Sequence, residues 1–473
     1  MRPNVILIVC DTLRADHLSS YGYPRVTSPF IDALADSGTI FDNCYAPAIP
    51  THPGFTTILS GMHPLQHQIV SHMGQETFDR NLPWLPEILS NNGYETIAFD
   101  NLLKWFQRGF NRYINTGENA TGISDIVAED VNNKVGEHLD ELSLLNSSQK
   151  PFFLFLHYWD THTPYNPPNQ FLEKFYKDNK SNPLSRSMEK VKMISPIWFI
   201  HKTWLDGVTD TEYVSAAYDA EILYLDTALR NLFNDFQKRN LLDNSIVILT
   251  SDHGESLTEH DVYFDHHTLY NENIHVPLII SGSAFSKKTP IDHGLCQQQD
   301  IVPTLLSLLK IQTDKKMIYG HDLLDFSLRN ESGNLYDKVI SLENTWESKM
   351  SLTTERYKLI RTVKDVDLYG RKSGYLELYD LRKDPDENVN LAYSSDKVTE
   401  MMNKELDTAV EEILQGRQNP VFVQPCSLRG NFDPSRDFAS VSGRKLSKNV
   451  CAWKVPDTGD ILSINMGIQN DKK

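Results

Sequence analysis

Short apolar runs, each the length of one strand and separated by helical segments, constrain the fold of this chain more than any other feature. The first run, residues 4–10, is apolar at nearly every position, which is typical of a strand buried on both faces of a sheet. Four later runs have the same character and cover residues 94–99, 151–157, 245–250 and 276–280. Strands that alternate with helices predict an α/β fold, in which a mostly parallel sheet is sandwiched by helices.

The composition is that of an ordinary globular protein. A chain of 473 residues with 40% hydrophobic and 23% charged residues can bury a large core. Its net charge of −17 argues against nucleic acid or an anionic membrane surface as a partner. The five cysteines include no C-x-x-C pair, which argues against a zinc knuckle or a disulfide framework. The first apolar run is too short for a signal peptide or a membrane span, so we expect a cytoplasmic protein.

The hydrophobic pattern changes near residue 330 and predicts two structural units. Residues 1–330 carry the strand and helix alternation of a catalytic α/β domain, with an aromatic-rich insertion at 183–210. Residues 331–415 show short alternating strands followed by a helix, so we expect a small C-terminal α+β subdomain with an antiparallel sheet. Residues 416–473 have little periodicity and form a C-terminal extension.

Polar residues directly follow two of the predicted strands. Asp11 ends the first apolar run, and Asp252 and His253 come just after the run at 245–250. Open α/β sheets place their sites at the carboxyl ends of the strands, so we expect these side chains to converge. Thr51 stands before an apolar helical stretch, and its hydroxyl has two interpretations. It is a nucleophile, or it caps a helix whose N-terminus would also suit an anion.

These segments together resemble the sulfatase branch of the alkaline phosphatase superfamily. In that family the nucleophile lies in a C/S-x-P-S-R motif, whose first residue is oxidised to formylglycine. Here the aligned residues 51–55 read T-H-P-G-F and are followed by the matching I-L-S-G. The stretch E-L-Y-D-L at 377–381 resembles the family's C-terminal subdomain. The resemblance spans most of residues 4–415 and implies an alkaline-phosphatase-like fold, but the chain cannot make formylglycine at Thr51.

The resemblance implies that Asp11, Asp252, His253 and the Thr51 oxygen hold a divalent metal. The family usually has a second acid after Asp11, where this chain has Thr12. A mixed set of oxygen and nitrogen ligands suits Mn²⁺ or Zn²⁺ better than Ca²⁺.

Two histidines are the expected partners of the transferred group and the leaving oxygen. His162 lies in an H-T-P-Y stretch and falls on a family histidine with that role, for which a pKa near working pH is suitable. The alternative is a structural histidine beside a Pro-Tyr turn. His266 replaces the lysine that sulfatases use on the sulfate and the leaving group. His266, with Asp160 or His162, could hold a second metal.

The resemblance also implies which residues contact the substrate. Asn101 stands at the position of another family lysine, and an uncharged residue there suits a substrate with less charge than a phosphate monoester. Asp160 precedes His162 and could orient it, and Tyr165 follows in the same motif. His72 either lines the same pocket or is a solvated loop histidine.

The single hydroxyl of Thr51 decides the expected chemistry. It must form an ester with the transferred group, which water then attacks with help from the metal. Relatives with a threonine nucleophile act on phosphoesters, so we expect a metal-dependent hydrolase of small-molecule phosphodiesters or phosphonate monoesters with a covalent Thr51 intermediate. Two alternatives stay open. One is a sulfuric-ester hydrolase of the arylsulfatase type, and the other is a non-catalytic binding protein that kept the fold.

The insertion gathers aromatic residues, namely Trp198, Phe199 and Trp204. Aromatic clusters of this kind mark a subunit interface or an apolar pocket, or they pack under their own loop. Phosphonate monoester hydrolases are oligomers whose added segments reach neighbouring subunits, and this resemblance favours a homo-oligomer.

Overall fold

The structure is a computed structural model of the whole chain. It describes residues 2–71, 77–118, 120, 122, 125–193, 198, 201–282, 292–312, 319–325, 334–364, 371–424, 426, 451–454 and 461–464. His72 and Phe199 therefore lie outside the described residues. Within the described ranges, no helix is both long and apolar enough to cross a membrane.

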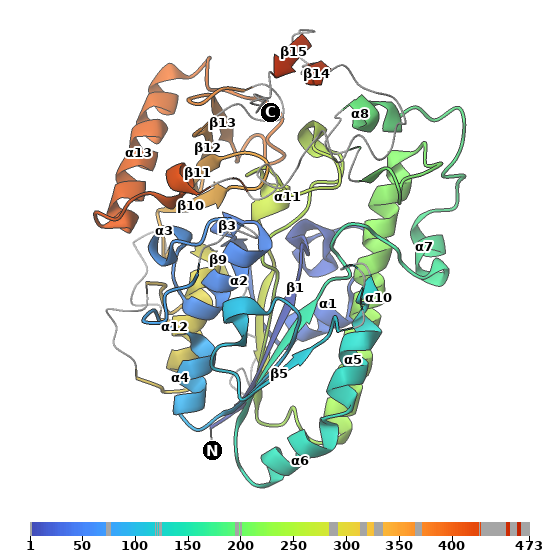
Figure 1. Cartoon of the computed structure of the whole chain (residues 1–473), viewed down its shortest axis with the longest axis vertical. Coiled ribbons are helices and arrows are strands. Elements are labelled where there is room, and N and C mark those ends of the chain that lie inside the picture. The colour runs from blue at the N-terminus through green and yellow to red at the C-terminus, as the bar shows by residue number, and fades with distance from the viewer. Residues whose placement is uncertain are drawn as a thin grey trace, which may run out of the picture.

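A large twisted sheet forms the centre of the molecule (Figure 1). In spatial order its strands are β5 (Arg112–Asn115), β4 (Glu95–Asp100), β6 (Phe152–Tyr158), β1 (Asn4–Cys10), β7 (Ser245–Thr250), β8 (Leu278–Gly282), β2 (Gly38–Tyr45) and β9 (Asp292–Gln297). All neighbouring pairs are parallel except those of β8, which runs against β7 and β2. The mostly parallel sheet expected from the apolar runs is confirmed.

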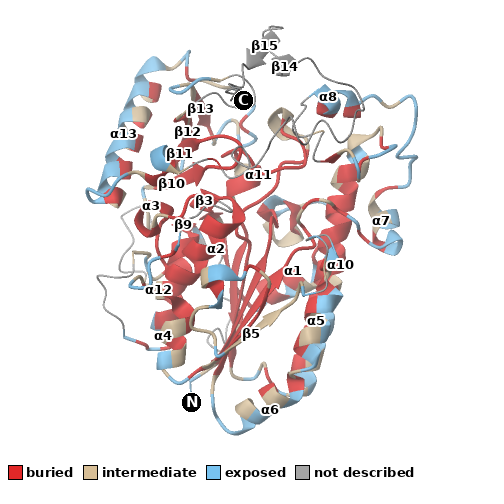
Figure 2. Cartoon of the chain, in the orientation of Figure 1, coloured by how far each residue is buried: buried red, intermediate tan, exposed pale blue. Residues whose placement is uncertain are grey.

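Helices cover both faces of this sheet. Figure 1 shows α2, α4 and α12 on one side of it and α1, α5 and α10 on the other. The α-helices are α1 (Pro29–Asp36), α2 (Thr51–Ser60), α3 (Pro64–His67), α4 (Leu85–Asn91), α5 (Ala128–Gly136), α6 (Leu139–Ser147), α7 (Asn169–Phe175), α8 (Met188–Met193), α10 (Thr211–Lys238), α11 (Asn271–Ile274), α12 (Ile301–Leu308), α13 (Asp396–Leu414) and α14 (Pro420–Val423). Burial concentrates in the sheet and on the helix faces that touch it (Figure 2), because strands with two covered faces must be apolar throughout.

A second sheet joins the C-terminal part of the chain to the segment that precedes helix α2. Its strands, in spatial order, are β13 (Leu376–Asp380), β12 (Tyr357–Thr362), β11 (Lys349–Thr354), β10 (Lys338–Glu343) and β3 (Ala48–Ile49). The first four pair antiparallel, as expected, whereas β3 comes from far upstream and pairs parallel to β10. A strand of two residues leaves no periodic signal in a sequence, so β3 was missed.

The apolar residues of this sheet form a small core of their own with α13. The helix has an apolar stripe with buried Met402, Leu406 and Val410. Because β3 leads into Pro50 and Thr51, this sheet helps to fix the start of α2.

Two tryptophans of the aromatic insertion, Trp198 and Trp204, pack against the main body. The ring of Trp204 lies 5.7 Å from that of Tyr165 and 6.1 Å from that of Phe264, between ring centroids. Trp198 is partly buried and also contacts the main core. These contacts favour packing under the local loops for both tryptophans. The homo-oligomer stays a prediction. In the C-terminal extension, β14 (Cys451–Lys454) and β15 (Ile461–Ile464) form a two-stranded antiparallel sheet.

Candidate metal centre and active site

Strand register brings the two predicted aspartates to one edge of the main sheet. Val9 of β1 pairs with Thr250 of β7, and Asp11 and Asp252 each lie two residues further on. Side chains two residues apart point to the same face, so both carboxylates leave the sheet on one side at its carboxyl edge. His253 follows Asp252 directly and is also fully buried.

Asp11, Asp252 and His253 form the one group of three or more potential ligand side chains found among the described residues. One ligand atom from each lies within 4.8 Å of the other two. Both carboxylate oxygens of Asp11, Oδ2 of Asp252 and Nε2 of His253 are buried without a hydrogen-bond partner. Buried polar atoms are normally paired, so the set fits a divalent cation. The second metal that His266 could hold with Asp160 or His162 has no comparable group in the described ranges.

The pKa shifts in this group also fit a divalent cation. Burial opposes ionisation of Asp11, but its contact with His157 and the charges of His162 and His253 outweigh burial and lower its pKa to about 2. Burial and the charge of Asp11 raise the pKa of Asp252 well above its ordinary value. Burial, followed by the charge of His266, lowers the pKa of His253 to about 3, which leaves a lone pair for a metal.

Thr51 is the first residue of α2 and is buried. The N-cap position belongs to Pro50, and no side-chain hydrogen bond caps the helix, so the capping interpretation of the Thr51 hydroxyl finds no support. The helix packs closely on Asp252, because a Cβ placed on Gly54 would lie 3.1 Å from Cβ of Asp252. Phe55, where the family has arginine, places its ring 4.4 Å from that of His157.

Thr12 does not replace the missing acid. Its hydroxyl donates to the backbone oxygen of Thr161 at 2.5 Å, and its backbone N–H donates to Oδ1 of Asp252 at 3.2 Å. Its side chain is therefore engaged with the loop after β6, while its backbone helps to orient Asp252.

The two predicted catalytic histidines lie together beside His253. The ring of His266 is 4.4 Å from that of His253 and 5.5 Å from that of His162. Nδ1 of His162 lies 2.6 Å from the backbone oxygen of Thr163, and Nδ1 of His266 lies 3.2 Å from Oε1 of Glu255. In each ring Nδ1 is the donor, so Nε2 is left for other contacts. Burial opposes the charged form of His266, but Glu255, Asp265 and Asp11 raise its pKa to about 9.

The predicted substrate residues are engaged in other contacts. Oδ1 of Asn101 accepts a hydrogen bond from Nε1 of Trp159 at 2.7 Å, and the Trp159 ring lies 5.6 Å from that of His162. Oδ1 of Asp160 accepts from the backbone of Ala128 at 2.9 Å, and burial raises the pKa of Asp160 to about 7. Asn101 thus holds Trp159, which packs against His162, and Asp160 holds the start of α5.

Tyr165 is buried in an aromatic group. Its ring lies 5.2 Å from that of Tyr218 and 5.7 Å from that of Trp204. Tyr218 in turn donates its hydroxyl to the backbone oxygen of Thr12 at 2.8 Å. Tyr165 thus backs the loop that follows Asp11.

Three residues near the centre were not identified from the sequence. Glu255 is fully buried and contacts both histidine loops. His157 ends a predicted strand and pairs with Asp100, with Nδ1 2.6 Å from Oδ1 of the carboxylate. A histidine at the end of an apolar run was the available signal for His157, whereas the partners of Asp100 and Glu255 depend on the fold.

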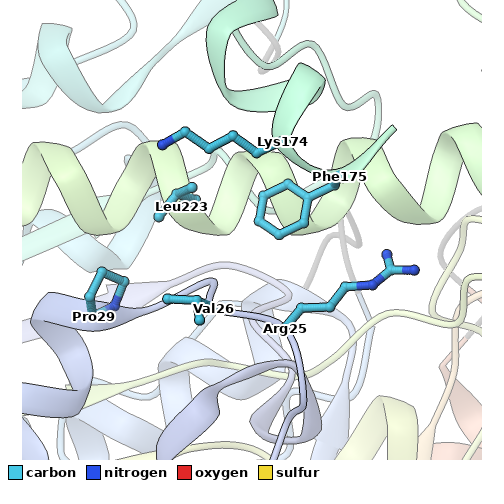
Figure 3. Close-up of a pocket in the computed structure, with 6 residues that line it drawn as sticks. All are labelled: Arg25, Val26, Pro29, Lys174, Phe175 and Leu223. Atoms are coloured by element: carbon cyan, nitrogen blue, oxygen red, sulfur yellow. The ribbon is translucent and has the colours of Figure 1, made fainter. Parts of the chain in front are cut away.

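A separate pocket of about 540 Å³ lies between the loop before α1, helix α7 and helix α10 (Figure 3). Its lining residues are Arg25, Val26, Pro29, Lys174, Phe175 and Leu223. None of the predicted site residues lines it. The Arg25 guanidinium is already paired with Asp219 and Glu212, each at 2.8 Å.

Family models match the chain over both of its structural parts. Residues 3–311 match the Sulfatase family, and residues 258–415 match the family described as N-sulphoglucosamine sulphohydrolase, C-terminal. The chain belongs to the sulfatase family. Sulfatases are hydrolases of the alkaline phosphatase superfamily and generally use a divalent metal ion, in agreement with the buried ligand group.

Relatives of this sulfatase-family chain cover most of its length. It is 26% identical over 422 residues to Delta 4,5-hexuronate-2-O-sulfatase of Bacteroides thetaiotaomicron, which covers 83% of this chain and 85% of that protein. A solved sulfatase-fold neighbour holds its substrate D-glucosamine-2-N,6-O-disulfate. It has a TM-score of 0.68 and 19% identity, and the match covers 89% of this chain and 99% of the neighbour. Phosphonate monoester hydrolase of Agrobacterium radiobacter gives a TM-score of 0.66 at 19% identity, over 87% and 96% of the two chains.

The expectation of a phosphodiesterase or phosphonate monoester hydrolase is wrong. The similar curated proteins that span the chain are named sulfatases, whereas the likeness to the phosphonate monoester hydrolase shows the fold alone. The physical reason is that sulfate and phosphate esters are both tetrahedral anions handled by similar metal sites. A threonine at the nucleophile position therefore does not determine which ester is cleaved.

Proposed function

We propose that the protein hydrolyses sulfate monoesters of small molecules, with sulfated sugars as the substrate class. One observation carries the proposal: the buried, unpaired group of Asp11, Asp252 and His253 lies against the start of α2, in a chain whose similar full-length relatives are named sulfatases. The sugar class follows from the hexuronate substrate in the name of one relative and the disulfated glucosamine bound by a structural neighbour.

Thr51 is the proposed nucleophile. A divalent cation held by Asp11, Asp252 and His253, with the Thr51 oxygen nearby, would neutralise charge on the sulfuryl oxygens. The hydroxyl oxygen of Thr51 forms a bond to sulfur as its proton passes to a water molecule, and the ester S–O bond breaks. The position at the N-terminus of α2 favours the negative charge that the sulfuryl group brings.

His162 and His266 are the proposed proton donors. Both rings have Nδ1 engaged, by Thr163 and Glu255 respectively, so Nε2 is the nitrogen that can meet the departing oxygen. One of the two gives its proton to the leaving alcohol. Water then attacks sulfur, the S–Oγ bond breaks, Thr51 regains a proton and inorganic sulfate leaves. In sum, one sulfate ester anion and one water give one alcohol, one sulfate dianion and one proton.

The test compares matched esters on the metal-reconstituted protein. Aryl sulfate, aryl phosphonate and aryl phosphodiester share one leaving group, and glucosamine 6-sulfate tests the sugar class. We expect release of inorganic sulfate, measured by ion chromatography, with the sulfate esters giving the highest kcat/KM. If every sulfate ester stays at the background rate while the protein is folded and metal-loaded, the proposal is wrong.

A further inference from the structure

We propose that His201, in the aromatic insertion, is a specificity-determining residue that donates a hydrogen bond from Nε2 to an oxygen of the sugar in the bound ester. The inference rests on the proposed function and adds to it a contact with the alcohol portion of the substrate. That contact lies beyond the metal ligands and the two proposed proton donors.

Trp204 of the insertion lies between the two loops that carry the proposed proton donors. Its ring centroid is 5.7 Å from that of Tyr165, which follows His162 by three residues. It is 6.1 Å from the ring centroid of Phe264, which precedes His266 by two residues. The insertion therefore contacts both loops through one side chain.

His201 lies one helical turn before Trp204 and is hydrogen-bonded to it. The backbone oxygen of His201 accepts from the N–H of Leu205 at 3.0 Å, and Nε1 of Trp204 donates to Nδ1 of His201 at 3.0 Å. An indole N–H can only donate, so Nδ1 of His201 carries the lone pair. The neutral imidazole must then carry its hydrogen at Nε2, and Trp204 fixes this tautomer.

The N–H at Nε2 of His201 is a buried donor. His201 is 5% exposed, and its Nε2 has no hydrogen-bond partner among the residues that the structure describes. Burial lowers the pKa of His201, although the charges of Asp265 and Glu255 oppose this effect, so the ring is neutral at pH 7. A buried N–H without an acceptor is costly, and we therefore expect it to meet an acceptor when the site is filled.

The place of His201 in the fold favours the sugar over the sulfuryl group as this acceptor. The metal ligands stand at the ends of β1 and β7, whereas His201 belongs to the insertion that packs on the outer side of the histidine loops. In the proposed reaction Thr51 and the metal hold the sulfuryl group, and His162 or His266 meets the departing oxygen. The alcohol portion then extends from that oxygen toward the insertion. Sugar hydroxyl and ring oxygens accept hydrogen bonds from a neutral N–H.

The test compares two kinds of sulfate ester on the metal-reconstituted full-length protein. A simple aryl sulfate has no oxygen beyond the ester group, whereas glucosamine 6-sulfate and other sulfated monosaccharides have several. His201→Leu removes the donor and should lower kcat/KM for the best sugar sulfate about 10-fold, while kcat/KM for the aryl sulfate stays within about twofold of wild type. His201→Gln keeps an N–H near the position of Nε2 and should recover part of the loss on the sugar.

Trp204→Phe tests the role of the tautomer. It keeps an aromatic ring between the two loops but removes the N–H that binds Nδ1 of His201, so kcat/KM for the sugar sulfate should fall about threefold or more and that for the aryl sulfate should not. Trp198→Phe, at a tryptophan of the same insertion that lies against Lys192, is the matched control and should behave as wild type. If His201→Leu does not fold, as judged by circular dichroism, Trp204→Phe gives the answer.

Wild-type kinetics on the sugar sulfate in both His201→Leu and Trp204→Phe would overturn the role of His201 and leave the sulfatase activity standing. Equal losses on the aryl and sugar esters would overturn the assignment of the contact to the sugar. So would a wild type that cleaves the aryl sulfate and no sulfated monosaccharide. A wild type that cleaves no sulfate ester at all would reject the proposed function, and this inference with it.

Discussion

Oε1 of Glu255 lies 3.2 Å from Nδ1 of His266, while Oε2 of the same carboxylate accepts a hydrogen bond from the backbone N–H of Thr163 at 3.3 Å. Glu255 is fully buried. One side chain therefore holds both loops that carry the proposed proton donors, since Thr163 follows His162 directly. This arrangement sets the ring of His266 and the path of the backbone at His162 together.

Glu255→Gln should lower kcat more than it changes KM. The amide keeps the size and one acceptor oxygen, but it removes the charge that holds the His266 imidazole in its orientation. A positioned acid or base typically contributes about 10²- to 10⁴-fold, so we expect a loss of roughly 10- to 100-fold when it is only disturbed. Steady-state kinetics on an aryl sulfate measure both constants. Glu212→Gln, which removes an exposed partner of Arg25, is the control. A loss confined to KM would argue against a positioning role.

Thr51→Ala should lower turnover by about a thousandfold or more, because it removes the proposed covalent route. Thr51→Ser keeps a hydroxyl and should retain measurable activity. Rapid quenching of the wild type during turnover should reveal one sulfuryl group on the peptide that contains Thr51, by mass spectrometry. Thr408→Ala, on α13 away from the site, should behave as wild type. If Thr51→Ala turned over at near-wild-type rates, Thr51 would not be the nucleophile.

The sequence predicted much of the main sheet because its strands are apolar on both faces. The predicted runs at 4–10 and 245–250 are β1 and β7, with the same limits. Once these strands are adjacent and parallel, Asp11 and Asp252 must meet, so the centre of the site was predictable as well. The register that brings them together is set by backbone pairing of β1 with β7, and it shows in the equal position of the two aspartates after their strands.

Contacts between side chains that lie far apart along the chain could not be predicted from the sequence. Asn101 was expected at the substrate, but its oxygen accepts from Trp159, a residue 58 positions away along the chain. The pairing of His157 with Asp100 depends in the same way on two neighbouring strands. The prediction of the substrate class was wrong for a different reason. Thr51 determines which covalent route is available, whereas sulfate and phosphate esters present nearly the same shape and charge to the site.

Two buried histidines should make the protein sensitive to acid. Nδ1 of His63 accepts from the backbone N–H of Leu65, and Nε2 lies 3.1 Å from the backbone oxygen of Ile340, to which it must donate. Protonation would destroy the acceptor. Burial accordingly lowers the pKa of His63 to about 4, and burial followed by the charge of His63 lowers that of His67 well below 6.5.

The sign follows from proton uptake. Between pH 6.5 and 4 the unfolded chain binds protons at these positions and the folded chain does not, so the free energy of unfolding falls as the pH falls. For His63 alone the loss between pH 7 and pH 5 is about 2 kcal/mol. Urea unfolding at the two pH values measures it. His63→Asn keeps an acceptor for Leu65 and should reduce the pH dependence, whereas His293→Asn, at an exposed histidine, should not. An equal pH dependence in wild type and His63→Asn would contradict the assignment.

Gly54→Ala tests how closely helix α2 must approach the metal ligands. The added Cβ would lie 3.1 Å from Cβ and 3.2 Å from the backbone oxygen of Asp252, so the helix or the aspartate must shift by a few tenths of an ångström. Alanine favours the helix by up to about 1 kcal/mol over glycine, which partly offsets the crowding. We therefore expect a small change in thermal stability together with a loss of activity of roughly 10-fold or more, because Thr51 and Asp252 move relative to each other.

Gly136→Ala, at the last residue of α5 where the new Cβ meets no atom within 4 Å, is the matched control. It should be equally or more stable than wild type and fully active. Wild-type activity in Gly54→Ala would mean that the spacing between Thr51 and Asp252 is not critical for the reaction.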